Sequence, residues 1–345
     1  MKKNLFLTVL CLTALFASAN IYRDGGNYKY EEKKTVEKTF DVSAKPILEM
    51  EGKYSDFIIT SWDQQQIDFK VNITVKSDNN EKLKAKINSI DVYFDKVGNK
   101  VIARTMFGDY PYKTFNGSMS IKYYVRVPKD VFMELETKYG DIKVDTVYNK
   151  FEVDIKYGDL KADNLLDVSS IDVKYGNVII NSAKTIKLEM GYSDANITKC
   201  EQLDGDLKYS NIYISELGHG MLENKYTTVK IDKADIIGFD DNAYSDLTVR
   251  NVTNTLSAEL RYTDLAAAVT SSVPRVKIDA QYSDVELGIN KDASFYYNLE
   301  SSYADISFKG FFDSKTIGRQ GTYGEGERGM LDITTRYGDV DIRKN

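Results

Sequence analysis

Apolar residues recur along this chain with a period of mostly 17 or 18 residues, and a tyrosine marks each copy of the repeat. The third and fifth residues after the tyrosine are apolar in every copy, as with Leu160 and Ala162 after Tyr157. Two apolar positions separated by a polar one are typical of a β-strand that buries one face. The repeat tyrosines are Tyr54, Tyr139, Tyr157, Tyr175, Tyr192, Tyr209, Tyr226, Tyr244, Tyr262, Tyr282, Tyr303 and Tyr337.

A second strand is predicted before each tyrosine, because the residue four positions earlier is usually apolar, as Val153 is before Tyr157. Inward positions lie at even distances before the tyrosine and at odd distances after it. The inward–outward alternation therefore shifts by one residue between the two strands. A glycine, serine or threonine followed by Asp, Asn or Thr stands there. We expect a corner at this point, since glycine tolerates unusual dihedral angles and Asx side chains bond nearby backbone.

A fixed period of this size indicates one structural unit stacked on copies of itself. The pattern therefore predicts an all-β fold, a single-stranded parallel β-helix (β-solenoid) with about 17–18 residues per coil. Regular coils are expected over residues 136–308. Residues 318–345 are expected to hold a glycine-rich loop, interpreted as a hairpin, and a closing coil.

The period disappears over residues 67–127. This insertion is expected to begin with a strictly alternating strand, to continue with a short helix carrying Leu83 and Ile87 on one face, and to form a hairpin turning near Gly98-Asn99. We expect it to cap the first coil as a β-rich layer, because the end of a solenoid otherwise exposes core and unpaired strand edges. Trp62 is expected to plug that end of the core.

The first residues have the features of an export signal. A basic start, a short apolar run and Ala17-Ser18-Ala19 predict a signal peptide over residues 1–19, followed by a flexible leader (20–34) and a single domain (35–345). No later stretch is long and apolar enough to predict a transmembrane segment. We therefore expect a protein of the periplasm, cell surface or extracellular space. Cys200 would be the only cysteine of the mature chain, so no internal disulfide is expected.

The charge pattern argues against a nucleic-acid partner. The formal net charge is −6 with acidic and basic residues interleaved, whereas nucleic acid requires a basic face. The residue three before the tyrosine is usually acidic and the residue directly before it is often basic. Stacked coils would place these residues in an acidic row beside a basic row. A solvated face is the simpler interpretation, and a face that binds a polyelectrolyte is the alternative.

Several motifs stand in order along the mature chain. Ser61-Trp62-Asp63 follows the first repeat strand, Val125-Arg126-Val127-Pro128 ends the insertion, Leu135 to Ile142 reads LETKYGDI, and Tyr323-Gly324-Glu325-Gly326 comes late. Together with the signal peptide they resemble the DUF4097/DUF2807 group of secreted bacterial repeat proteins, often described as adhesins. The resemblance covers nearly the whole mature chain and implies a β-helix-like fold outside the cytoplasm. It supplies no catalytic residues.

A row of corner aspartates is the candidate site most open to alternative interpretations. Stacked carboxylates could bind calcium, or could include the acids of a polysaccharide lyase or hydrolase. Asn177, Asn211 and Thr228 interrupt the row, and its members look equivalent, so we favour corner hydrogen bonding and expect no metal, cofactor or catalytic residue. The row comprises Asp56, Asp141, Asp159, Asp194, Asp246, Asp264, Asp284, Asp305 and Asp339.

The tyrosines could stack on sugar rings if they point outward. By phase, they are expected to face inward or to cap the corner and stack coil on coil. His219, the only histidine, is expected in a turn without further metal ligands, and Cys200 is expected to be a small buried residue, with an exposed thiol that forms a dimer as the alternative.

These features favour a non-enzymatic binding or adhesion module of the cell surface or periplasm. Its partner would be a surface glycan or another envelope protein. The alternatives are a carbohydrate-active β-helix enzyme and a purely structural envelope component.

Overall fold

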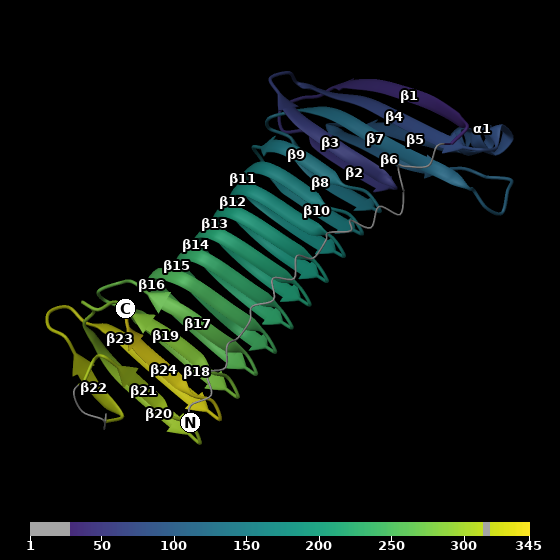
Figure 1. Cartoon of the computed structure of the whole chain (residues 1–345). Helices are drawn as coiled ribbons and strands as arrows, with labels where there is room; N and C mark the ends of the chain where they lie inside the picture. Colours follow the sequence, from purple (N-terminus) through teal and green to yellow (C-terminus); the bar gives the residue numbers. More distant parts are fainter. Residues whose placement is uncertain (1–27, 313–317) are drawn as a thin grey trace.

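The computed structural model describes residues 28–312 and 318–345. Within them the chain forms 24 β-strands and one α-helix, arranged as a rod with the N-terminal strands at one end (Figure 1). Successive coils stack along the rod through parallel strand pairing, so the predicted β-solenoid is confirmed. The expected signal peptide and residues 20–27 of the expected leader lie outside the described residues.

Each regular coil consists of two arms that meet at the tyrosine. In one coil, β10 (Phe151–Lys156) leads to Tyr157 and β11 (Leu160–Lys174) leaves it. β11 is long because it continues around the opposite side of the rod into the next coil. Neighbouring coils pair in register, for example Asp154 with Asp172. One coil therefore rises by a single strand spacing, about 4.8 Å.

The same unit repeats along the middle of the rod. The bend opposite the tyrosine is made inside continuous strands, where a shift in register such as that between Leu165 and Val168 lets the backbone turn. The other central strands are β8 (Phe132–Lys138), β9 (Ile142–Val147), β12 (Asn177–Gly191), β13 (Asp194–Lys208), β14 (Asn211–Lys225), β15 (Thr228–Ala243) and β16 (Asp246–Arg261).

The core is a continuous stack of side chains from both arms. Val153 and Ile155 face inward from β10, while Leu160, Ala162 and Leu165 face inward from β11, and all five are buried. The alternation predicts the first four of these positions, whereas Leu165, eight residues after Tyr157, falls outside it. Because every coil places similar side chains above and below, the apolar core is uninterrupted along the rod.

The insertion adds a layer below the first coil. β2 (Ile47–Lys53) and β3 (Ser55–Trp62) pair in parallel with β6 (Lys100–Phe107) and β7 (Gly117–Pro128), respectively. Antiparallel strands then close this end: β5 (Ile90–Val97) pairs with β6, β4 (Gln66–Ser77) with β7, and β1 (Tyr30–Asp41) with β4. The rod end is thus covered by strands whose direction breaks the parallel stack.

The helix α1 (Asn80–Asn88) packs against this cap and buries Leu83 and Ile87. Its N-cap is Asn79, whose side chain accepts a hydrogen bond from the Lys82 N–H at 2.9 Å. An Asn at this position satisfies one of the free N–H groups of the first turn.

Two expectations for this end are wrong. Residues 30–34 are not a flexible leader but part of β1, which pairs with β4 from Tyr30–Ser77 to Asp41–Gln66. Trp62 does not plug the core: it is half-buried, its Nε1 donates to the Gln66 carbonyl at 2.8 Å, and the Arg126 guanidinium lies over its ring at 4.2 Å. The indole is held at the surface because its N–H needs a polar partner.

The other end of the rod departs from chain order. The coil β23–β24 was expected to close the rod, and this expectation is wrong. It lies between the coil β18–β19 and the outermost coil β20–β21. The strands of this end are β17 (Asp264–Val269), β18 (Arg275–Gln281), β19 (Val285–Ile289), β20 (Phe295–Ser302), β21 (Ile306–Lys309), β22 (Gln320–Tyr323), β23 (Gly329–Arg336) and β24 (Val340–Lys344).

The expected glycine-rich hairpin is also wrong. β22 pairs antiparallel with β20, not with the following β23. Aromatic side chains, among them Phe295, Phe308 and Phe311, pack together at this tip. They fill the end of the core, because the last coil has no further coil to cover it.

The corner glycines serve close approach rather than unusual dihedral angles. A Cβ on Gly158 would lie 2.0 Å from the Gly140 carbonyl oxygen, and a Cβ on Gly176 would lie 1.9 Å from that of Gly158. The residue with positive φ at each corner is the tyrosine, not the glycine. The expected reason for glycine is therefore wrong, although its position at the corner is right.

We predict that Gly158→Ala destabilises the fold by about 1–3 kcal/mol, because the new methyl group meets backbone that cannot move away. Gly191→Ala is the matched control, since its Cβ would meet only the flexible Lys174 side chain at 3.6 Å. Urea unfolding followed by circular dichroism measures both. Equal urea midpoints for the two variants would show that close packing at the corner does not determine the stability of the fold.

Candidate functional site: the tyrosine ladder

The repeat tyrosines form one continuous column of stacked rings, here called the tyrosine ladder. Neighbouring ring centroids lie 4.8–5.1 Å apart and the ring planes differ by 2–17°. At the capped end Phe107 packs edge-on against Tyr54 at 6.1 Å. At the tip the order is Tyr282, Tyr337, Tyr303, because the last coil is inserted.

The backbone at every ladder tyrosine is left-handed, with φ between 50° and 62°. This conformation costs a non-glycine residue about 1–2 kcal/mol. It is held by an axial hydrogen bond, as when the Tyr157 N–H donates to the Lys174 carbonyl of the next coil at 2.9 Å.

Stacking offsets the strain of this backbone. Twelve tyrosines make eleven stacked pairs, each contributing about 0.5–1.5 kcal/mol beyond burial. Burying about 100 Å² of each ring between its neighbours adds ~2.5 kcal/mol. The ladder is therefore net stabilising.

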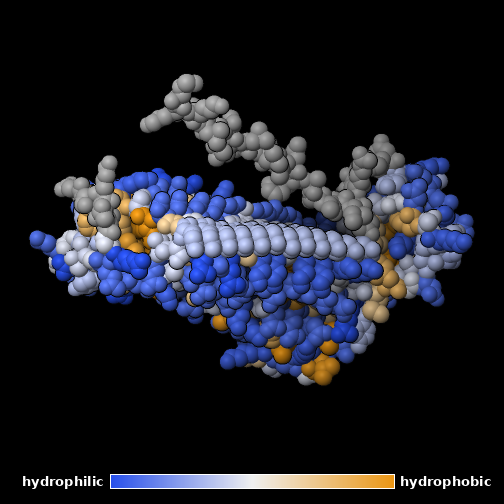
Figure 2. Space-filling model, turned by 90° about the horizontal axis from the view of Figure 1, so that it is seen from below, coloured by the Kyte–Doolittle hydropathy of each residue, from blue (hydrophilic) through white to orange (hydrophobic). Residues whose placement is uncertain are grey.

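The rings cap the corner and stack coil on coil, but they do not face inward. From Tyr157 to Tyr282 each is 43–54% exposed, and Tyr303 at the tip is 83% exposed. Figure 2 shows the ladder as a straight, pale ridge across a largely hydrophilic surface. Eleven steps of 4.8–5.1 Å make it about 55 Å long.

What the ladder presents is ring edges and hydroxyl groups. The faces of all internal rings are covered by neighbouring rings, so a sugar ring cannot stack on them. None of the ladder hydroxyls from Tyr139 to Tyr337 bonds to a group in residues 28–312 or 318–345. Each hydroxyl can donate one hydrogen bond and accept others, so the ridge offers regularly spaced polar contacts.

Charged rows run beside the ladder as the sequence predicts. The residue before the tyrosine and the acidic residue two positions earlier form ion pairs within a coil, as in Lys156–Asp154 at 3.2 Å, Lys174–Asp172 at 3.0 Å and Lys208–Asp206 at 2.7 Å. Exposed pairs of this kind add little stability. They pair individual lysines with the acidic row beside them.

The corner aspartates bond to backbone across coils. The Asp159 N–H donates to Asp141 Oδ1 at 2.9 Å, and the Asn177 N–H donates to Asp159 Oδ1 at 2.8 Å. The same contact joins Asp284 to Asp264, and Asp305 to Asp339. This is the corner hydrogen bonding that the sequence favours. The described residues contain no group of three or more acidic, His or Cys side chains arranged to hold a metal.

Where serine or threonine replaces the corner glycine, its hydroxyl carries the link between coils. The Ser193 N–H donates to Ser210 Oγ of the next coil at 3.3 Å, and the Thr227 N–H donates to Ser245 Oγ of the next coil at 3.1 Å. Glycine, serine and threonine share one position of the repeat, so the sequence pattern did not reveal this second type of corner.

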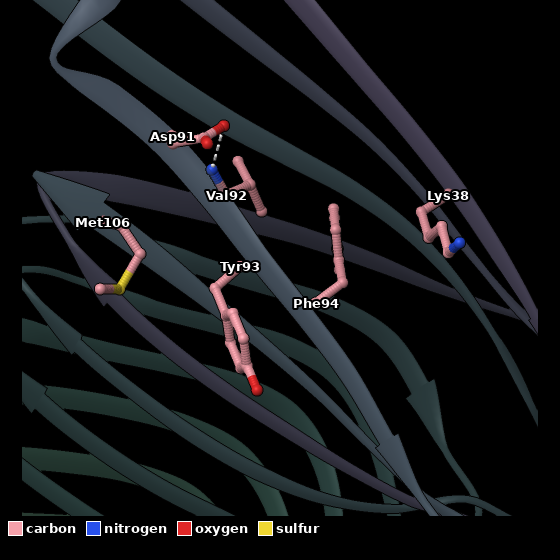
Figure 3. Close-up of a pocket in the computed structure, with 6 residues that line it drawn as sticks. All are labelled: Lys38, Asp91, Val92, Tyr93, Phe94 and Met106. Carbon is pink, nitrogen blue, oxygen red and sulfur yellow. Dashed lines mark hydrogen bonds between the residues drawn. The ribbon is translucent and has the colours of Figure 1, made fainter.

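A shallow hollow of about 450 Å³ opens in the cap between β1 and β5, lined by Lys38, Val92, Tyr93, Phe94 and Met106 among others (Figure 3). Side chains occupy three of the backbone groups on the strand edges around it. Asp91 accepts from the Val92 N–H at 3.0 Å, and Lys34 and Lys96 donate to the Ile90 and Asp41 carbonyls. Such side-chain caps protect an edge from added strands.

The two remaining candidate residues, Cys200 and His219, are not part of the ladder. Cys200 is buried and hydrogen-bonded to the Gln202 carbonyl, and burial raises the pKa of its thiol to about 12, which removes the exposed-thiol alternative. His219 lies within β14 and not in a turn, because the repeat continues there as strand; its Nε2 is 3.8 Å from Asp235.

A model of the family described as Toastrack DUF4097 matches residues 34–343. The chain belongs to this family. The search of curated proteins found no match. No helix within residues 28–312 and 318–345 is long and apolar enough to cross a membrane.

Three solved structures of similar proteins extend the comparison. They are a "putative cell adhesion protein" from Clostridium sporogenes (9% identity, 91% of this chain and 100% of that one, TM-score 0.18), and two proteins from Parabacteroides distasonis. One of these is a "putative adhesin" with 11% identity, which covers 74% of this chain and 97% of that one at a TM-score of 0.39. The other is a "putative lipid binding protein" with 10% identity, which covers 90% of this chain and 96% of that one at a TM-score of 0.36.

We predict that Tyr209→Asn lowers the free energy of unfolding by about 2–4 kcal/mol, while Tyr209→Val lowers it by about 4–5 kcal/mol. Both remove two ring contacts, but Asn tolerates the left-handed backbone and a β-branched residue does not. Chemical denaturation measures the difference. If Val proved as stable as Asn, the backbone strain inferred at the ladder would be absent.

The thiol of Cys200 should not react in the folded protein. With a pKa of about 12, roughly one thiol in 10⁴ is ionised at pH 8, and the side chain is buried. Labelling with a chromogenic disulfide should therefore be slow until denaturant is added. Rapid stoichiometric labelling without denaturant would contradict the buried position.

Proposed function

We propose that this protein is a non-enzymatic, exported binding module whose tyrosine ladder engages an extended, repetitive partner, a linear polysaccharide being the best match. The observation that carries the proposal is the ladder itself: half-exposed tyrosine edges repeated every 4.8–5.1 Å along a straight ridge. This spacing is comparable to that of successive units in an extended polysaccharide. The adhesive names of the similar proteins agree with a surface role.

The chemistry of the ridge suits weak repeated contacts. Each ring edge supplies a small apolar surface and each hydroxyl a donor and acceptor, a combination that favours sugar hydroxyl groups over a fully apolar ligand. A single contact of this type is weak. Contacts at regular intervals on one rigid rod act together, so affinity should rise steeply with the length of the bound polymer.

The competing proposal is a carbohydrate-active β-helix enzyme. One observation favours it: desolvation, together with the nearby Asp56 and Asp159 carboxylates, raises the pKa of Asp141, which is the direction a general acid requires, although the residue is exposed to solvent. The carboxyl of Asp141, however, accepts the Asp159 N–H, as its neighbours accept theirs, and it lies in a row of equivalents. A purely structural role does not account for the exposed tyrosine hydroxyl groups.

We predict that replacing Tyr175, Tyr192 and Tyr209 together by Asn reduces binding to long linear glycans at least tenfold. A glycan array graded by chain length, followed by calorimetry on the best ligand, measures this. The matched control replaces three exposed tyrosines outside the ladder, Tyr124, Tyr148 and Tyr296, by Asn, and should change binding less than threefold.

Three results would contradict the proposal. Equal losses in both triple variants would remove the ladder from binding, and the absence of any length-dependent glycan binding would favour the structural role. Release of new chain ends from a polysaccharide, abolished by Asp141→Asn, would establish the enzyme instead.

A further inference from the structure

The last coil along the chain occupies a slot inside the rod. β23 pairs with β18 on one side and with β20 on the other, and β24 pairs in the same way with β19 and β21. Tyr337 accordingly stacks between Tyr282 at 4.8 Å and Tyr303 at 5.1 Å. Residues 329–344 are thus inserted between two coils that precede them in sequence.

The fit of this segment rests on the pairing that repeats along the rod, together with local contacts such as Asn298 Nδ2 to Asp332 Oδ1 at 2.9 Å. Ile333 pairs in register with Ile278 on one side and with Leu299 on the other. The Asp339 N–H donates to Asp284 Oδ1, and the Asp305 N–H donates to Asp339 Oδ1, both at 2.9 Å. The slot is therefore equally complementary to the same segment of another molecule.

The segment cannot remain undocked at low cost. Leu331, Ile333, Val340 and Ile342 are fully buried in the slot. Each contributes about 1.5–3 kcal/mol by burial, so a released segment would expose a strongly apolar face. It must occupy a slot, either in its own rod or in a second one.

The connection to the segment is short and constrained. β22 lies on the outer edge of β20 and β23 on its inner edge, so residues 324–328 carry the chain around the start of β20. Gly324 and Gly326 have φ of +77° and +80°, and a Cβ on Gly324 would lie 2.3 Å from Ser294 Oγ. Glycine adopts these angles without strain, so the hinge is limited by its length: five residues must reverse the chain around the start of β20. Short hinges favour exchange between molecules, because an extended hinge does not need this tight reversal.

We propose that two copies of this chain exchange residues 329–344, so that the C-terminal coil of each fills the slot of the other. The exchanged pair keeps every strand contact of the single rod and differs only at the hinge. The two rods are joined tip to tip, with both caps outward and a tyrosine ladder on each rod. This assembly does not depend on what the ladder binds.

The first test strains the hinge without touching the slot. Gly326→Val places a β-branched residue at φ +80°, and no atom lies within 4 Å of its Cβ. Gly98→Val is the matched control, since Gly98 has φ +63°, equally open surroundings and a place in the β5–β6 turn, where exchange offers no relief.

Both full-length variants are refolded at high concentration and examined by size-exclusion chromatography with light scattering. We expect Gly326→Val to raise the dimer fraction at least tenfold over the parent chain, with Gly98→Val unchanged. Monomeric Gly326→Val, destabilised to the same extent as Gly98→Val, would overturn the proposal.

The second test identifies the exchanged segment. Asp279 on β18 faces Thr334 on β23 in register, which suits a disulfide. Chains carrying Asp279→Cys and chains carrying Thr334→Cys, both with Cys200→Ala and Gly326→Val, are unfolded, mixed, refolded and oxidised. Exchange predicts a disulfide between the two different chains, found by mass spectrometry. Dimers without this 279–334 disulfide would show association by another route and refute the exchange.

Discussion

The structure depends on one constraint: each coil must sit a single strand spacing from the next at every point, including the corner. The axial hydrogen bond from the tyrosine N–H to the carbonyl before the next tyrosine enforces this, as between Tyr157 and Lys174. Straight strands can pair at this spacing with any side chain. At a corner the backbones of neighbouring coils approach more closely, so the residue there must have no side-chain atom between them. Glycine leaves room by having no Cβ, and at the serine and threonine corners a backbone N–H bonds to the hydroxyl of the next coil instead.

The ladder follows from the same constraint. Once the backbone turns through a left-handed residue, the side chain at that position points along the corner and repeats at the coil spacing. Planar rings at about 4.8 Å are close enough to stack, whereas aliphatic chains at a left-handed position would bury less area for a similar strain. Asn is the cheaper residue for this backbone, so ring stacking and the exposed hydroxyl are what tyrosine adds at the corner.

Much of this fold is readable from the sequence because its signal is local and repeated. The inward positions Leu160 and Ala162, the helix around Leu83 and the stacked corner all follow from alternation and period. The sequence did not show which residue has positive φ. The shift in alternation is compatible with a left-handed residue at Tyr157 or at Gly158, and glycine is the more usual choice. The strand over residues 30–34 was missed because an edge strand is protected by charge, which makes it look like a leader.

Coil order could not be read for a deeper reason. In a repeat, every coil is complementary to every other, so residues 329–344 fit between β18 and β20 as well as they would on the outer edge of β20. Pairing is decided by the length and stiffness of connections such as residues 324–328, which carry no periodic signal. The same equivalence bears on activity. A surface made of a dozen near-identical units has no reason to single out one carboxylate, as catalysis requires, but it can add many weak contacts along a line. The equivalence of the coils thus leaves their order unreadable from the sequence, and the same equivalence underlies the proposed recognition of a long partner.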